Sequence, residues 1–249
     1  MYKRRFGKFR LILWLGIVPC FLLNGGCYHK KVPATGEERA IPAINKVVVV
    51  GFLPAMQQGD KADVVRDPIS GSVFMAEPVP QGVARRMTDV LFNRLVDDER
   101  FGLVSPGQAR GVFSKIVDSD RNVGMAPVSI AQAVGRSFRA DAVLAGYIYR
   151  WREREGGDYA VKRPASVAFN LHLIRPSDGA ILWKSKYDKT QRSLSENLFD
   201  YSTFVEGGGR WMTAEKLAMI GLEKLLAQMP GARVKEDEKP AEKTEEGDN

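Results

Sequence analysis

The nine residues KVVVVGFLP, at 46–54, constrain the fold more than any other stretch of this chain. They form an unbroken apolar run that is rich in β-branched side chains, which favour strands. A strand with one solvated face alternates apolar and polar residues, whereas a continuous run indicates a strand buried on both faces. The run therefore predicts a sheet with other structure packed against each side.

The residues that follow predict helices that could cover such a sheet. Residues 80–98 predict an amphipathic helix, Ser105 caps a second one, and a third begins near Pro127. A short helix is expected around 194–205, and Thr213 caps the last one. The inward positions of the first helix are Val83, Met87, Val90, Leu91 and Leu95.

The second half of the chain changes to a period of two residues, which is typical of strands. The runs at 140–154, 165–175 and 180–189 predict an antiparallel three-stranded meander. The polar face of the middle run, which includes His172, is expected to meet solvent or a helix. Residues 55–79 are expected to be irregular, with a turn at RDPISGS.

The order of these elements predicts an α/β (α+β) fold. It would be a single domain over residues 45–230, with a mixed sheet that includes the antiparallel meander and with helices packed on it. Residues 27–44 are polar and contain Pro and Gly, so we expect a linker that reaches at most about 60 Å. Residues 231–249 are expected to be a disordered tail, because from Lys235 onward they are rich in acids and lack large apolar side chains.

A basic segment and a short apolar run open the chain. Residues 1–10 contain five basic residues and no acid, and LILWLGIVPCFLL follows at 11–23. A transmembrane helix needs roughly 20 apolar residues, so this run is too short to span a bilayer. A basic start, a short apolar run and small residues at a cleavage site are typical of a secretory signal peptide, here residues 1–26.

The cleavage region, LNGGC at 23–27, resembles the lipobox of bacterial lipoproteins. In that family the cysteine receives a diacylglycerol, the signal peptide is removed, and the new amino terminus is acylated. The resemblance implies that Cys27 carries a lipid anchor, and Tyr28 after it implies the outer membrane, with the body on the periplasmic face. Asn24 departs from the apolar residue that the family prefers, which leaves open an ordinary signal peptide cut near Gly26.

The formal charge of +7 comes largely from the segment that is expected to be removed. Five of the 37 Lys and Arg residues lie there, and the rest of the chain is close to neutral. The charge therefore gives no reason to expect a nucleic-acid partner. Cys27 would be the one cysteine left, so no disulfide is expected and stability has to come from a packed core.

The order of elements also resembles a group of bacterial envelope lipoproteins. The shared features are a lipobox, a short linker, a VVVVGFLP first strand, and helices followed by a meander and a closing helix. The group includes the curli-secretion channel lipoprotein, the penicillin-binding-protein activator lipoprotein and the N-terminal domain of the Tol-system propeller protein. The resemblance implies contact with other envelope proteins rather than catalysis.

Few residue patterns point to chemistry. The stretch DSDRNVG at 118–124 begins like a calcium loop, but the Gly and Glu required later in that pattern are missing. GGGR at 207–210 lacks the Lys-Ser/Thr of a phosphate loop. The two histidines are His29, in the linker, and His172, and acylation of Cys27 would exclude a Cys–His pair. We expect no catalytic residue, no metal and no cofactor.

The stretch YIYRWRER at 147–154 is a candidate partner surface. Strand alternation would place its aromatic residues on one face and its arginines on the other. Tyr, Trp and Arg dominate binding hot spots, so Tyr149, Arg150, Trp151 and Arg152 are the candidate residues. The alternative is an aromatic core face backed by a solvated arginine face.

Three functions follow from these observations. The leading hypothesis is an outer-membrane-anchored lipoprotein that acts as a non-enzymatic interaction module in envelope assembly or export. Its lipid would contact the membrane, and its partners would be envelope proteins. Whether it forms oligomers is left open. The first alternative is a subunit of a curli-type secretion channel, but the 64–75 segment is short and the 150–163 segment is highly charged for membrane strands. The second alternative is an envelope hydrolase, for which no suitably spaced acids and bases are found.

Overall fold

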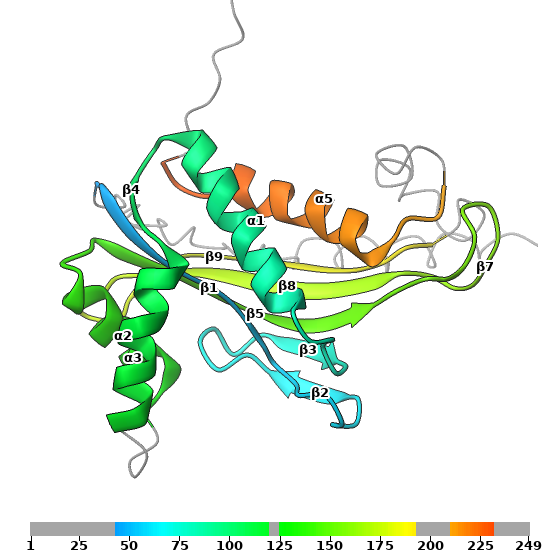
Figure 1. Ribbon diagram of the computed structural model, residues 1–249, viewed down its shortest axis with the longest axis horizontal. Helices are drawn as coiled ribbons and strands as arrows, with labels where there is room; N and C mark the ends of the chain where they lie inside the picture. The colour runs from blue at the N-terminus through cyan, green and yellow to red at the C-terminus, as the bar shows by residue number, and fades with distance from the viewer. Residues whose placement is uncertain (1–42, 120–124, 193–209, 232–249) are drawn as a thin grey trace, which may run out of the picture. The chain divides into compact units, whose positions relative to one another are not determined.

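The computed structural model describes residues 43–119, 125–192 and 210–231. Within them a five-stranded mixed sheet has the strand order β4-β1-β5-β8-β9, and helices pack on both of its faces (Figure 1). This is the predicted α/β (α+β) class. The strands are β1 (Lys46–Pro54), β4 (Gly102–Val104), β5 (Ala142–Arg152), β8 (Ser166–Ile174) and β9 (Ile181–Thr190). The helices are α1 (Val83–Asp98), α2 (Pro106–Ser119), α3 (Pro127–Ser137) and α5 (Ala214–Ala227).

The sheet is parallel at one side and antiparallel at the other. β1 pairs in parallel with both β4 and β5, whereas β5, β8 and β9 form the antiparallel meander that the sequence predicts. Parallel neighbours need long crossover connections, and the helices α1, α2 and α3 lie in these connections. A very short hairpin of β6 (Glu155–Gly156) and β7 (Val161–Arg163) separates β5 from β8.

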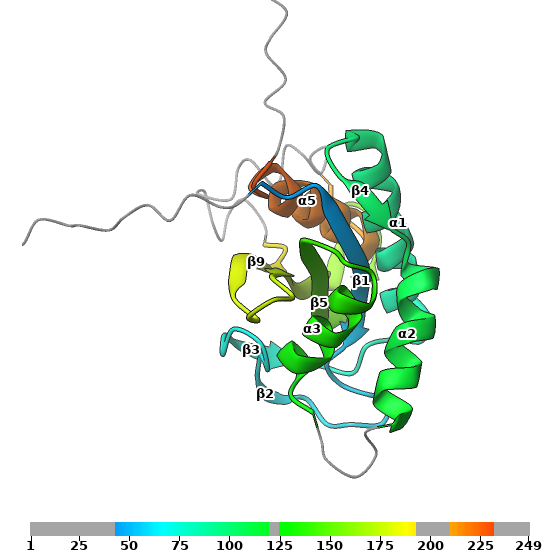
Figure 2. The ribbon, with the colours of Figure 1, turned by 90° about the vertical axis from the view of Figure 1, so that its left-hand side faces the viewer.

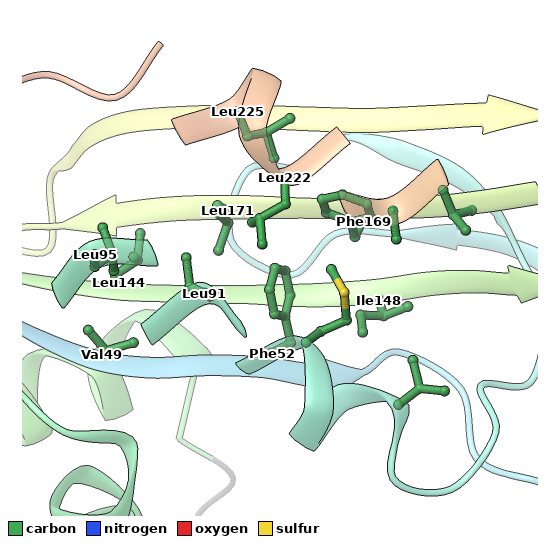
Figure 3. Close-up of a cluster of buried hydrophobic side chains, with 14 of the residues drawn as sticks. Val49, Phe52, Leu91, Leu95, Leu144, Ile148, Phe169, Leu171, Leu222 and Leu225 are labelled. Carbon is green, nitrogen blue, oxygen red and sulfur yellow. The ribbon is translucent and has the colours of Figure 1, made fainter. Parts of the chain in front are cut away.

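Helices α1 and α5 cover one face of the sheet and enclose the larger core, which is shown in Figure 3. Val83, Met87, Leu91 and Leu95 of α1 are buried as the spacing predicts, and Val90 is half-buried against the same core. The Thr213 hydroxyl caps α5 by accepting a hydrogen bond of 3.2 Å from the Lys216 N–H. Burial of each such aliphatic side chain contributes about 1.5–3 kcal/mol. The labelled core residues are Val49, Phe52, Leu91, Leu95, Leu144, Ile148, Phe169, Leu171, Leu222 and Leu225.

Two groups of elements pack on the opposite face of the sheet. Helices α2 and α3 pack over one part, and a hairpin of β2 (Asp63–Arg66) and β3 (Val73–Ala76) packs over another. Figure 2 shows this hairpin and α5 on opposite sides of the sheet. The prediction that residues 55–79 are irregular is therefore wrong, although the predicted turn does join the two strands. Each strand has four residues, which is too short for alternation to stand out in the sequence.

Several predictions concern residues outside the described ranges. These are the signal peptide, Cys27, most of the linker, the helix at 194–205, and parts of the 118–124, 207–210 and 231–249 segments. Among the residues that the structure does describe, no helix is long and apolar enough to cross a membrane.

Candidate interaction surface

The β2–β3 hairpin is fixed to the sheet by its inward side. The Phe74 ring stacks on the Tyr149 ring of β5, with centroids 3.9 Å apart and planes 6° from parallel. At the end of β3, the Glu77 N–H donates a 2.8 Å hydrogen bond to the Tyr149 carbonyl. Stacked and offset aromatic pairs contribute about 0.5–1.5 kcal/mol beyond the area that they bury. The hairpin is thus attached through one residue of β5 in two ways.

A buried carboxylate holds the turn of the hairpin. Asp67 Oδ2 accepts hydrogen bonds from the Tyr149 hydroxyl at 2.5 Å and from the Asn170 side-chain amide at 2.7 Å. Asp67 Oδ1 accepts from the Ser70 hydroxyl at 2.8 Å and lies 3.4 Å from Nε2 of His172. Since Tyr149 belongs to β5 while Asn170 and His172 belong to β8, one side chain joins the turn to two strands.

The hydrogen bonds decide the charge of this cluster. Burial alone would raise the pKa of Asp67, but hydrogen bonds from Tyr149, Ser70 and Asn170 outweigh burial and lower that pKa. Burial lowers the pKa of His172, although the negative charge of Asp67 acts in the opposite direction. Burial and the hydrogen bond to Asp67 both raise the pKa of Tyr149, far above its usual value. At neutral pH Asp67 is therefore ionised, whereas His172 and Tyr149 are neutral.

This cluster contains a serine, a histidine and an acid, but not in a catalytic order. The Ser70 hydroxyl donates to Asp67, whereas a nucleophilic serine has to give its proton to a base such as histidine. His172 is buried beside the hairpin turn, so the expectation that it faces solvent or a helix is wrong. In the described part of the chain, no group of three or more His, Cys, Asp or Glu side chains could hold a metal ion.

The outward side of the hairpin is exposed, and three of its four side chains are apolar. The strand register pairs Val64 with Met75 and Arg66 with Val73. These four side chains therefore lie on one side of the hairpin, and the buried Phe74 lies on the other side. Val64, Val73 and Met75 are 58%, 49% and 53% exposed. We call these four residues the hairpin face. Apolar side chains that cluster on a surface in this way are typical of contact sites.

The candidate surface at Tyr149, Arg150, Trp151 and Arg152 is arranged differently from the prediction. A bulge interrupts the pairing of β5 with β8 between Ile148 and Arg150, so Tyr149 and Arg150 both turn to the hairpin side. Both are buried, and Trp151 and Arg152 are half-buried. The alternation that would expose Arg150 is therefore wrong, and a partner role for Trp151 and Arg152 stays a prediction.

Arg150 and Arg152, which follow the bulge, contact the hairpin and the residue after it. Arg150 donates to the Met75 carbonyl at 2.8 Å and to the Ser166 hydroxyl at 2.7 Å, and it also pairs with Asp188 of β9. Arg152 pairs with Glu77, just after β3, at 2.7 Å. A bulge cannot be recognised from the residue types alone, which is why the sequence did not reveal this arrangement.

A small apolar pocket lies on the same side of the sheet, between α2, α3 and the strands β1 and β5. Its volume is about 60 Å³, well below the roughly 300–1,000 Å³ of pockets for drug-sized ligands. Its lining includes Val50, Ile69, Phe113, Ile130, Val134 and Tyr147.

The fold and this surface define the class: a mixed α/β domain that presents an exposed hairpin face. No protein-family model matches the chain, and no curated protein matches it. Solved structures that resemble it include the LpoB C-terminal domain from Salmonella enterica, with 21% identity, a TM-score of 0.32, and coverage of 60% of this chain and 84% of that one. Another is the hypothetical protein CT253 from Chlamydia trachomatis, with 11% identity, a TM-score of 0.42, and coverage of 76% and 97%.

A third similar structure is the lipoprotein GNA1162 from Neisseria meningitidis. It has 12% identity and a TM-score of 0.35, and the alignment covers 66% of this chain and 99% of that one. Likenesses of this degree carry no conclusion about the function of this chain. The resemblance to the curli-secretion and Tol-system groups stays a prediction.

Proposed function

We propose that this protein is an outer-membrane-anchored periplasmic lipoprotein that acts as a non-enzymatic interaction module in envelope assembly or export. The observation that carries the proposal is the sequence LNGGC at 23–27, which follows a basic segment and a short apolar run. In this arrangement Cys27 bears the acyl chains. Each buried methylene contributes about 0.8 kcal/mol, and more than one chain is needed for a stable anchor.

The described part of the chain supports an interaction role through the hairpin face. Its apolar side chains are exposed, while contacts of Asp67, Tyr149 and Arg150 hold the inward side of the hairpin on the sheet. Such fastening limits the conformational entropy that an interface loses on binding. A surface that is apolar and held in place is suited to contact with another protein.

The anchor is tested by metabolic labelling with palmitate. We expect label on the wild-type protein and none on Cys27→Ser, and we expect the wild type to sediment with outer membranes. Mass spectrometry of the purified protein should show a mature chain that begins at an acylated Cys27. An unmodified thiol, or a chain that retains Met1, would contradict the anchor.

The interaction role is tested by photo-crosslinking in cells. A photoreactive residue replaces Val73 or Met75 on the hairpin face, and the matched control is Val96 of α1, which is 49% exposed. We expect discrete crosslinked products from the two hairpin positions and not from the control. Equal products from all three positions, or none from the hairpin, would argue against a docking role for this face.

A further inference from the structure

The β9 edge of the sheet is the longer of its two edges. In the strand order, β4 and β9 are outermost; β4 has three residues and β9 has ten. Among the described strands, β9 pairs with β8 only. The outer side of an edge strand presents N–H and C=O groups that can pair with another chain. Tyr187 and Lys189 have further interactions of their own, so the relevant segment is Leu182–Lys186.

This segment carries two exposed, positively charged lysines. Lys184 and Lys186 are exposed and lie opposite His172 and Asn170 of β8, on the same side of the sheet as the hairpin. Neither lysine forms an ion pair with a described residue; Lys186 Nζ lies 5.6 Å from the centre of the Phe74 ring. The acid on the same strand, Asp188, is already paired with Arg150.

We propose that Leu182–Lys186 is a docking edge for an extended acidic segment of a partner protein, which adds to the sheet as a strand beside β9. This inference rests on the proposed interaction role and names the contact that serves it. Side chains of an added strand alternate between the two faces of the sheet. Alternate residues would then face Lys184 and Lys186, and acids at those positions would complement them.

The residues between these acids would face the other side of the sheet. There they would lie next to Trp183, which is half-buried and packs against the larger core beneath α5. Apolar side chains suit that position because they would extend the core. The docking segment therefore alternates acidic and apolar residues, and backbone pairing along the edge supplies the remaining contacts.

The positive charge of the docking edge also favours an acidic segment over a second copy of this chain. A second copy that paired through β9 would bring lysines close to lysines, and like charges across strands are destabilising. An anionic bilayer would attract the same lysines, but it would not form a backbone ladder. The two alternatives can therefore be told apart from strand addition by experiment.

The test uses the purified full chain in detergent and a short capped peptide of alternating Glu and Val, with binding followed by fluorescence anisotropy. We expect saturable binding that weakens with salt. Two further peptides carry N-methyl groups on every Val or on every Glu. If a ladder forms, at least one methylated peptide loses binding; if both bind like the parent peptide, strand addition is wrong.

Charge reversal supplies the second arm. We expect Lys184→Glu/Lys186→Glu to weaken binding of the Glu/Val peptide by on the order of tenfold and to create binding of a Lys/Val peptide. The matched control is Arg85→Glu/Arg86→Glu, on the exposed side of α1, which should bind like the wild type. Circular dichroism checks that both variants fold.

Four further outcomes would overturn the proposal. They are no saturable binding, an equal loss in the α1 control, self-association that the β9 reversal abolishes, and binding to phosphatidylglycerol vesicles in place of the peptide. None of these measurements requires Cys27 to be acylated. A failure here is therefore distinct from a failure of the proposed anchor.

Discussion

Replacement of Asp67 tests how the hairpin is held. In Asp67→Ala the buried Tyr149 hydroxyl and Asn170 amide lose the carboxylate oxygen that both contact within 2.7 Å. A buried donor left without a partner costs about 1–3 kcal/mol, so two cost about 2–6 kcal/mol. Loss of the carboxylate also removes the cost of burying its charge. We therefore expect the free energy of unfolding to fall by about 3 kcal/mol.

Urea denaturation followed by tryptophan fluorescence measures this loss. Asp67→Asn keeps one oxygen acceptor and should cost about half as much, and Asp63→Ala, at an exposed position of the same hairpin, should change stability by less than about 0.5 kcal/mol. A double-mutant cycle with Tyr149→Phe should show coupling between the two residues. A loss below about 1 kcal/mol for Asp67→Ala, or no coupling, would refute the view that this carboxylate fastens the turn.

Three further predictions follow from single contacts. Gly51 has φ +85° and a Cβ there would lie 2.2 Å from Thr88 Cγ2, so Gly51→Ala should lower the thermal midpoint by several degrees in calorimetry, consistent with a loss of about 1–3 kcal/mol. Arg150→Met removes the donor to the Met75 carbonyl and should speed hydrogen exchange in β3 more than in β1. Burial lowers the pKa of His172 below its reference of 6.5, so the unfolded state binds a proton first as pH falls. Stability should therefore decline below about pH 6.5, and titration of unfolding should show a smaller decline in His172→Gln.

Local patterns were sufficient for the main elements of the fold. The unbroken run in β1 required burial on both faces, the stripe of α1 required a core on one side, and the cap at Thr213 marked the start of α5. Each of these signals lies within one element, because strand and helix periods record which side chains leave water. The antiparallel meander was likewise visible because its turns and its alternation are local in the sequence.

The candidate interaction surface could not be predicted from local sequence patterns in the same way. That Asp67 meets Tyr149 and Asn170 depends on a turn of the first half and two strands of the second half coming together. The bulge before Arg150 reverses which side chains face the hairpin, and nothing in the residue types at 147–154 marks it. The position of β9 at the edge of the sheet, which exposes Lys184 and Lys186, follows from strand order alone.

The sequence by itself therefore determined the main helices and strands, the buried faces of β1 and α1, and the expectation of a lipid anchor at Cys27. Tertiary structure decided which polar residues are buried, where the hairpin packs and which strand is left at the edge. The physical reason is that hydrophobic periodicity is set by neighbours a few residues apart. Hydrogen-bond partners such as Asp67 and Asn170, in contrast, are separated by 103 positions and become neighbours only when the sheet has formed.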